Sequence, residues 1–199
     1  MAKLYFKYGT MGSSKTAQAL ITKFNYEERK MGVLFLKPSV DTRDGKTMVR
    51  SRVGLLATAT VVPHEMNIYK LFSERTKLSQ IDVIIVDECQ FLSEKQVDEL
   101  GQIVLDFDIP VLCFGLRTDF QTKMFPGSKR LFEIADSISE IKYICQCGQK
   151  ASVNVRFDGN GRVMTEGEQV YLGGNESYVA MCRKCFQNIV KEQTGKDSN

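Results

Sequence analysis

One segment near the N-terminus limits the folds open to this chain more than any other feature. Residues 9–16 read GTMGSSKT and have the glycine, lysine and threonine spacing of a Walker A loop. The segment follows a β-rich aromatic run at residues 3–8 and precedes an amphipathic, helix-like segment that starts at Lys15. A strand, a glycine-serine loop and a helix in this order predict a phosphate-binding loop. A chance turn before a helix is the alternative, but it does not explain why all of these features occur in order.

The residues of this loop have separate roles in binding a nucleoside triphosphate. Its backbone N–H groups are expected to point at the phosphates, where the N-terminus of the following helix adds positive potential. Lys15 is expected to reach the β- and γ-phosphate oxygens, and the Thr16 hydroxyl to bind Mg²⁺. Ser14 replaces the usual glycine at a position that requires unusual backbone angles, so a lower affinity is one expected consequence. The predicted nucleotide-binding residues of the loop are Gly9, Thr10, Met11, Gly12, Ser13, Ser14, Lys15 and Thr16.

An acidic pair ends an apolar run in the middle of the chain. Residues 83–86 read VIIV and lead into Asp87 and Glu88, as a Walker B strand places carboxylates at its C-terminal edge. Asp87 is expected to bind Mg²⁺ beside the phosphates. Glu88 is placed to act as a general base, on water in an ATPase or on a hydroxyl in a kinase, and the pair alone does not decide between them. Acidic residues also follow buried strands simply where a chain reaches solvent, so this interpretation depends on the Walker A loop.

Short apolar runs alternate with helical patterns over the first part of the chain. The runs at residues 33–37, 82–87 and 111–115 are bounded by polar residues or glycine, as in strands buried on both faces. A further helix is expected from Glu94 to Phe107. The first helix is expected to have an apolar stripe of Ala17, Leu20, Ile21 and Phe24. The predicted fold class is therefore α/β, with a P-loop, RecA-like parallel sheet flanked by helices.

A small C-terminal module is expected where helical periodicity gives way to cysteine- and glycine-rich sequence. Its cysteines form a C-x-C and a C-x-x-C pair, whose four thiolates suit a closed, tetrahedral and therefore structural Zn²⁺ site. Redox-active or free thiols are the alternative. The predicted zinc ligands are Cys145, Cys147, Cys182 and Cys185. The expected boundaries are 1–142 for the nucleotide-binding domain, 143–190 for the zinc-stabilised β and loop module, and 191–199 for a disordered tail.

The overall composition fits a globular cytoplasmic protein that binds a small anion. The chain of 199 residues is 43% hydrophobic and 26% charged, with a net charge of +3. Basic residues are scattered, so nucleic acid is not an expected partner. The sequence shows neither a signal peptide nor an apolar stretch that suits a membrane span. In a reducing cytosol, Cys89 and Cys113 are interpreted as small core residues.

Five segments occur along the chain in a characteristic order: GTMGSSKT, KPSVDTRDG, DVIIVDECQF, FGLRTDFQTKMF and GEQVYLGGNESYVAMCRKC. Together they closely resemble the zinc-containing, tetrameric (type II) thymidine kinases over nearly the whole chain. The first segment is shared by many families. Asp-Glu-x-Gln-Phe combined with the glycine pair, tyrosine and cysteine pair of the last segment is much more specific. The resemblance implies transfer of the γ-phosphate of ATP to the 5′-hydroxyl of thymidine, giving dTMP, with Mg²⁺ and a structural Zn²⁺.

By this resemblance, the acceptor site combines catalytic residues, an apolar pocket and a closing loop. Glu88 is the base for the 5′-hydroxyl, Asp41 lies in the nucleotide site, and Arg43 steadies the transferring charge. The zinc-held segment resembles the family's lasso, a loop that closes over the nucleoside and excludes water. Lasso backbone groups are implied to bind the thymine edge at Val170, Tyr171, Leu172 and Gly173. The base pocket is implied to consist of Met11, Phe91, Leu116, Phe120, Phe125 and Tyr178, with Asn154 where the family often has threonine.

The expected small-molecule partners follow from the same pocket. Thymine offers O2, N3–H and O4 in a row, which matches an extended backbone, and an apolar cleft accepts its 5-methyl group. Deoxyuridine lacks only that methyl, which is worth about 1–3 kcal/mol in a hydrophobic pocket, so it is expected to be a weaker substrate. The resemblance also implies feedback inhibition by dTTP and a homotetramer. Without the resemblance, core packing is the simpler interpretation of Phe91, Phe120 and Phe125.

Two other functions remain open on the sequence. A RecA-like ATPase whose zinc module binds nucleic acid or a protein has the same phosphate-site motifs. Such a module is expected to show clustered basic residues and exposed aromatics, whereas residues 143–185 carry mixed charges and a glycine-bracketed loop. A structural zinc protein with a degenerate nucleotide site rests on Ser14 alone and leaves Lys15 and the acidic pair without a role. The kinase is therefore favoured.

Overall fold

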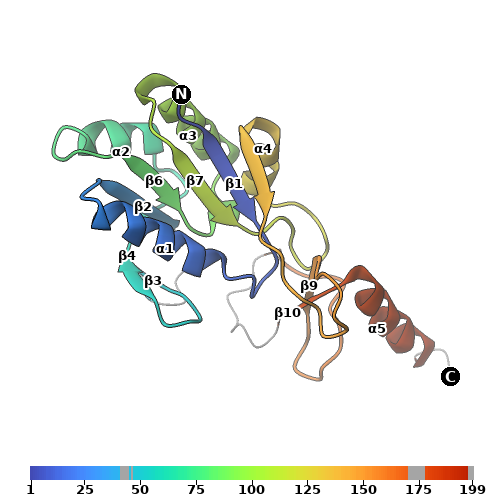
Figure 1. The fold of residues 1–199 in the computed structure, drawn as a ribbon. Coiled ribbons are helices and arrows are strands. Elements are labelled where there is room, and N and C mark those ends of the chain that lie inside the picture. The colour runs from blue at the N-terminus through green and yellow to red at the C-terminus, as the bar shows by residue number, and fades with distance from the viewer. Residues whose placement is uncertain (41–44, 46, 170–177, 197–199) are drawn as a thin grey trace.

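A parallel sheet forms the centre of the molecule in the computed structural model, which describes residues 1–40, 45, 47–169 and 178–196 (Figure 1). The sheet is six-stranded, in the order β5-β2-β6-β7-β1-β8, and every neighbouring pair runs parallel. Its strands are β1 (Leu4–Tyr8), β2 (Val33–Pro38), β5 (Thr60–Val62), β6 (Val83–Val86), β7 (Val111–Gly115) and β8 (Ser137–Glu140). The predicted α/β class is confirmed.

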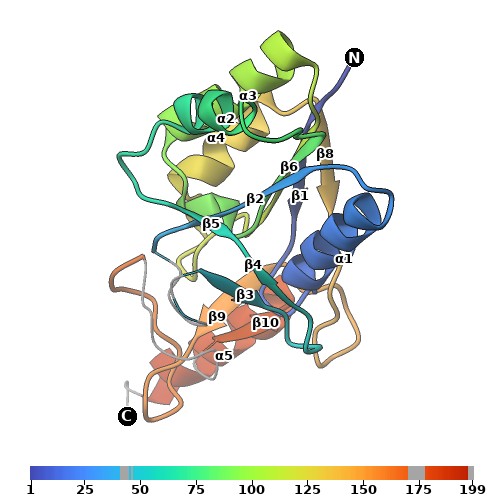
Figure 2. The ribbon, with the colours of Figure 1, turned by 90° about the vertical axis from the view of Figure 1, so that its left-hand side faces the viewer.

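Different helices cover the two faces of the sheet (Figure 2). One face packs against α1 (Lys15–Glu28), and the other against α2 (Ile68–Arg75), α3 (Glu94–Phe107) and α4 (Pro126–Ile134). Because both faces are covered, the strands carry continuous apolar sequence, and all residues of β6 are buried. Within the described part of the chain, no helix has the length and apolar character needed to cross a membrane.

Helix α3 has the bounds that the sequence predicted. The Ser93 side chain accepts from the Gln96 N–H at 3.2 Å, and the Gln96 side chain accepts from the Ser93 N–H at 3.1 Å. This capping box fixes the first turn.

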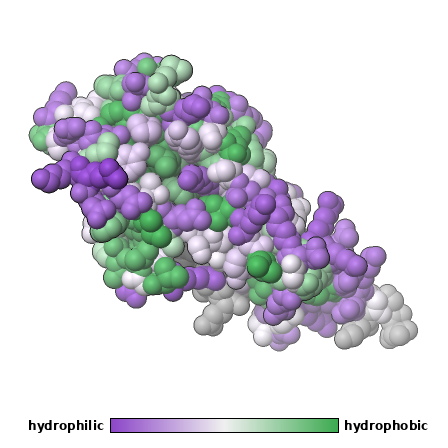
Figure 3. All heavy atoms as spheres, in the orientation of Figure 1, coloured by the Kyte–Doolittle hydropathy of each residue, from purple (hydrophilic) through white to green (hydrophobic). Residues whose placement is uncertain are grey.

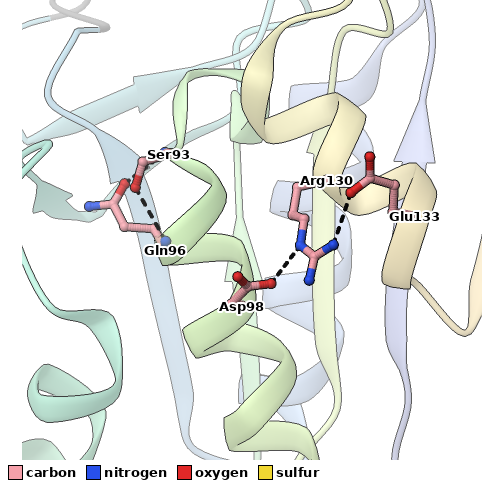
Figure 4. A network of polar contacts seen from close by, with 5 residues as sticks. All are labelled: Ser93, Gln96, Asp98, Arg130 and Glu133. Carbon is pink, nitrogen blue, oxygen red and sulfur yellow. Dashed lines mark hydrogen bonds and ion pairs between the residues drawn. The ribbon is translucent and has the colours of Figure 1, made fainter.

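An ion pair joins α3 to α4. Arg130 of α4 contacts Asp98 of α3 at 2.6 Å and Glu133 of its own helix at 2.9 Å (Figure 4). Helix α4 packs against η1 (Cys89–Phe91), the 3-10 turn between β6 and α3.

The apolar stripe predicted for α1 is only partly correct. Ala17 and Leu20 are buried, but Ile21 and Phe24 are 50% and 61% exposed. The reason is that Ala19 also faces the sheet, which rotates the buried arc of the helix away from Ile21 and Phe24. Helix α1 lies beside a hairpin of β3 (Met48–Arg50) and β4 (Leu56–Thr58) and contacts it through β3 (Figure 1).

The C-terminal module is a two-stranded antiparallel ribbon followed by a helix. Strand β9 (Val153–Arg156) pairs with β10 (Tyr178–Met181), and α5 (Arg183–Lys196) follows. The module's own small core consists of Cys145, Ala151, Val153, Val155, Ala180, Met181 and Cys182. The tail prediction was wrong for residues 191–196, which continue α5, because the first turns of α5 pack on this core and the helix propagates from them. Residues 197–199 lie outside the described part.

Candidate active site

The Walker A segment forms the loop between β1 and α1, where the sequence placed it. The Gly9 N–H donates to the Gly115 carbonyl at the end of β7, with an N···O distance of 3.2 Å. Lys15 is buried, and its Nζ donates to the Thr10 carbonyl at 2.7 Å. Gly12 and Ser14 have φ angles of +82° and +64°. These left-handed residues curl the loop around the lysine ammonium.

Two glycines at this edge are required by close packing. A Cβ on Gly9 would lie 2.4 Å from Ser13 Oγ and 2.6 Å from the Ile141 carbonyl oxygen. A Cβ on Gly115 would lie 2.6 Å from both Cys89 Sγ and Gln90 Oε1. Since real side chains do not approach so closely, glycine at these positions lets the loop and the turn after β6 lie against the ends of β1 and β7.

Two hydroxyl groups of the loop test whether it fits a phosphate ligand. Thr10 Oγ1 and Ser13 Oγ are buried, and neither finds a hydrogen-bond partner among the residues that the structure describes. Leaving a buried hydroxyl unpaired is unfavourable, and phosphate oxygens accept hydrogen bonds from hydroxyls. The hydroxyls, the Lys15 ammonium and the N-terminus of α1 together fit a triphosphate.

Asp87 directly follows β6 and contacts the first turn of α1. Its carboxylate accepts a hydrogen bond from the Thr16 hydroxyl. Burial first, and then the charge of Glu88, raise the pKa of Asp87 to about 7, although Thr16 and Lys15 act to lower it. Burial and the Glu88 charge disfavour the ionised form of this carboxylate, and a cation bound beside it would offset both effects. Hydroxyl and carboxylate oxygens are ligands that Mg²⁺ prefers, so Thr16 and Asp87 fit that metal.

Glu88 has a left-handed backbone, with φ +51°, and begins the η1 turn. Its carboxylate accepts a hydrogen bond from Gln90 Nε2, while Gln90 Oε1 accepts from the Leu116 N–H at 3.0 Å. Gln90 is almost fully buried and so holds the half-buried Glu88 in one orientation relative to β7. Sequence reasoning gave Gln90 no role, although its place two residues after Glu88 in the DECQF segment was a usable signal.

Aromatic side chains predicted for the base pocket gather in two contacts. Phe91 and Phe125 meet edge to face with ring centroids 5.6 Å apart. The Arg156 guanidinium lies 5.3 Å from the Phe120 ring centre and 5.9 Å from the Tyr178 ring centre. Phe120 and Phe125 are buried, whereas the other apolar candidates, Met11, Phe91, Leu116 and Tyr178, are half-buried. Each of the two aromatic contacts therefore pairs a buried ring with a partly exposed one, which a ligand could reach from solvent.

Asn154 joins the Walker A loop to the C-terminal module. Its Oδ1 accepts from the Met11 N–H at 2.8 Å, and its Nδ2 donates to the Thr118 carbonyl at 3.1 Å. The side chain is 4% exposed, so both of its polar groups are engaged within the protein. Sequence reasoning placed Asn154 beside the base, and the structure adds a direct contact with the phosphate loop.

Several predicted residues lie outside the described part of the chain: Asp41, Arg43, Val170, Tyr171, Leu172 and Gly173. Residues next to them show how the flanking backbone is held. Lys37 is fully buried, and its Nζ donates to the carbonyls of Gly45 at 3.2 Å and Met48 at 2.8 Å. The buried Asp119 accepts from Gln169 Nε2 at 2.9 Å. Lys37 and Asp119 were also not assigned a role from the sequence.

The four cysteines of the C-terminal module form one cluster, as predicted. Their Sγ atoms all lie within 4.8 Å of one another, and Cys147 and Cys182 are 3.6 Å apart. Four thiolates at about 2.3 Å from a central Zn²⁺ would be separated by roughly 3.8 Å, and the Cys147–Cys182 distance is close to this value. Hydrogen bonds from the backbone of Cys147 and Cys182 lower the pKa of Cys145 to about 6, whereas side-chain hydrogen bonds with Cys147 and Cys182 raise the pKa of Cys185 to about 12. The metal-free cluster therefore shares protons that a bound Zn²⁺ would displace. The residues present fit a structural zinc.

The sequence comparisons with known proteins agree on one family. A family model described as thymidine kinase matches residues 2–186. A thymidine kinase of Shewanella oneidensis is 47% identical over 190 residues, covering 96% of this chain and 99% of the relative. A thymidine kinase of Zymomonas mobilis is 44% identical over 186 residues, covering 94% and 96%. A solved structure of a DNA replication initiation factor aligns with 70% of this chain and 40% of its own chain, at 16% identity and a TM-score of 0.38. This likeness is too slight to bear on function.

Proposed function

The chain belongs to the thymidine kinase family, and on that premise we propose that Glu88 takes the proton of the thymidine 5′-hydroxyl while the Walker A loop holds ATP. The enzyme is an ATP-dependent nucleoside kinase. In the proposed step the 5′-oxygen bonds to the γ-phosphorus, and the bond from that phosphorus to the β,γ-bridging oxygen breaks. The proton moves to the Glu88 carboxylate. The products are dTMP and ADP.

The different environments of two adjacent carboxylates carry this assignment. Asp87 is 3% exposed and contacts Thr16 at the start of the Walker A helix, so it faces the phosphate site. Glu88 is half-buried and turned by its left-handed backbone into the contact with Gln90. We therefore assign Asp87 and Thr16 to Mg²⁺, which neutralises charge on the transferring phosphoryl group, and keep Glu88 for the acceptor.

We place the thymine base between the aromatic contacts and the lasso. Phe91, Phe120, Phe125 and Tyr178, with Met11 and Leu116, would line its apolar sides. The lasso backbone at residues 170–173 would bind the polar edge, with the preceding Gln169 held by Asp119. Arg43 would neutralise transferring charge and Asp41 would serve the nucleotide. Thymidine and deoxyuridine differ only in the 5-methyl group, so this pocket would accept deoxyuridine as a weaker substrate.

We propose that the zinc cluster is structural and that the chain divides at residue 142 into a nucleotide-binding domain and a lasso module. The four cysteines would fill the coordination shell and leave no open position for chemistry. Reduced thiols, in the cluster and at the buried Cys89 and Cys113, agree with a cytoplasmic location. A zinc-held module at 143–190 would then keep the lasso over the bound nucleoside.

We also propose a homotetramer and inhibition by dTTP. Hydrophobic side chains gather on the surface over α1 and the β3–β4 hairpin (Figure 3). They include Ile21, Phe24, Val53 and Leu56, which are all at least half exposed. Such a patch supports association with further copies of the chain.

Inhibition by dTTP follows from the two parts of that molecule. It carries both a thymine for the nucleoside pocket and phosphates for the Walker A loop.

Coupling of ADP release to dTMP formation tests the proposed function. Purified protein with ATP and Mg²⁺ should release ADP only when thymidine is present, in equal amounts with dTMP. A RecA-like ATPase, the alternative function, would release ADP without thymidine and faster with nucleic acid. That second result would remove the kinase proposal.

A further inference from the structure

We propose that Tyr143 stacks on the nucleoside base of the phosphoryl donor. This inference rests on the proposed binding of the donor's phosphates by the Walker A loop. It adds the part of the donor site that contacts the base, which the loop itself does not provide. It also places this contact on the segment that links the sheet to the zinc module.

The Tyr143 ring lies against the tip of the Walker A loop. A Cβ on Gly12 would be 3.1 Å from Tyr143 Cζ and 3.3 Å from both Cε1 and the hydroxyl oxygen. Glycine at position 12 therefore serves two purposes: it allows the positive φ, and it leaves room for the edge of the Tyr143 ring. Tyr143 is 39% exposed, so part of its side chain remains accessible to a ligand.

The order of the strands gives the direction in which a bound triphosphate runs. The γ-phosphate must lie near Asp87 and Glu88, which follow β6, and the loop that holds the β-phosphate follows β1. The order β6-β7-β1-β8 then leads the α-phosphate and nucleoside away from the acidic pair, toward the end of β8. Tyr143 follows β8 by three residues and lies beside the loop, where that path leaves the phosphates.

The backbone around Tyr143 is held from two sides. The Ile141 N–H donates to the Tyr8 carbonyl of β1 at 2.7 Å, and the Tyr143 carbonyl accepts from the Ala151 N–H at 2.8 Å. The ring is thus carried on a fixed support instead of a free loop. Stacking on an aromatic face tolerates any base, because every base has a π-face.

A tryptophan at this position gives a direct optical test. The chain has no tryptophan, so Tyr143→Trp introduces a single indole fluorophore beside Gly12. With Mg²⁺ present, saturating ATP should quench or shift its emission strongly through stacking, whereas inorganic tripolyphosphate, which fills the phosphate site without a base, should change it little. Equal responses to the two ligands would overturn the proposal.

Competition kinetics separate the base contact from the phosphate site. Tyr143→Ala should raise the KM for ATP about five- to tenfold and leave inhibition by tripolyphosphate and the KM for thymidine unchanged. Tyr143→Phe, which keeps the ring, should restore the KM for ATP. The control Ile144→Ala removes a 70% exposed neighbour and should have no effect. An unchanged KM for ATP in Tyr143→Ala would contradict the stacking contact but not the phosphate site. Inhibition by tripolyphosphate that survives Lys15→Ala would instead contradict the proposed phosphate site.

Discussion

The Met11 N–H of the Walker A loop donates a 2.8 Å hydrogen bond to Asn154 Oδ1 of β9, although 143 residues separate them in sequence. Asn154 Nδ2 also donates to the Thr118 carbonyl. One buried amide therefore connects the phosphate loop, the segment after β7 and the module that carries the cysteine cluster. We infer that the zinc module supports the shape of the phosphate loop in addition to holding the lasso.

Asn154→Ala should loosen this connection. Loss of the amide leaves a loop N–H and a carbonyl without their partner, which costs about 1–3 kcal/mol in the free energy of unfolding. The KM for ATP should rise as well, because the loop is less well held. Urea denaturation and initial-rate kinetics measure the two effects. The control Asn160→Ala changes an exposed turn residue and should alter neither quantity; identical behaviour of the two variants would contradict the connection.

Ser14→Gly should stabilise the protein. Ser14 has φ +64° and its side chain makes no capping hydrogen bond, so it has the cost of a left-handed backbone without compensation. Glycine removes about 1 kcal/mol of that strain. Thermal unfolding checks the gain, with Lys30→Gly as a matched change at φ +60° away from the site. A loss of stability in Ser14→Gly, together with a gain in Lys30→Gly, would show that the serine has a role of its own.

Much of this architecture could be predicted from local patterns. The buried strands and the bounds of α3 follow from apolar runs and helical spacing, and the cysteine cluster follows from its paired spacing. The exposure of Phe24 could not be predicted, because the angle at which a helix meets a sheet depends on residues such as Ala19 that carry little hydrophobic signal. The contacts of Gln90 and Asn154 depend on strand order, which brings distant segments together at one edge.

Removal of the metal should unfold the C-terminal module first. The module's small core includes Cys145 and Cys182, so a missing ligand removes both the metal and part of the packing. Cys147→Ser should reduce bound zinc, measured by elemental analysis, and abolish dTMP formation. Cys113→Ala changes a buried cysteine of β7 and should keep a full equivalent of zinc. Normal zinc content in Cys147→Ser would contradict the four-thiolate site.

Asp87 should make the Mg²⁺-free, zinc-loaded protein less stable as pH rises. The pKa of Asp87 is 3.8 in the unfolded chain and is raised to about 7 in the folded protein. Between these two pH values the folded state therefore binds more protons than the unfolded state. The stabilising contribution is complete below the unfolded pKa and lost as pH rises through about 7. Urea denaturation across this range should show the slope in the wild type but not in Asp87→Asn. Mg²⁺ added at pH 8 should restore stability to the wild type alone; parallel pH profiles would contradict this account.

The most direct test of the central claim is the single-turnover transfer of labelled γ-phosphate from ATP to thymidine by Glu88→Gln. If Glu88 is the base, the transfer rate should fall by about 10²- to 10⁴-fold, while the affinity for ATP remains because Lys15, Thr16 and Asp87 are intact. The control Glu94→Gln, at the exposed start of α3, should transfer phosphate at the wild-type rate. A near-wild-type rate in Glu88→Gln would contradict the assignment of Glu88 as the base.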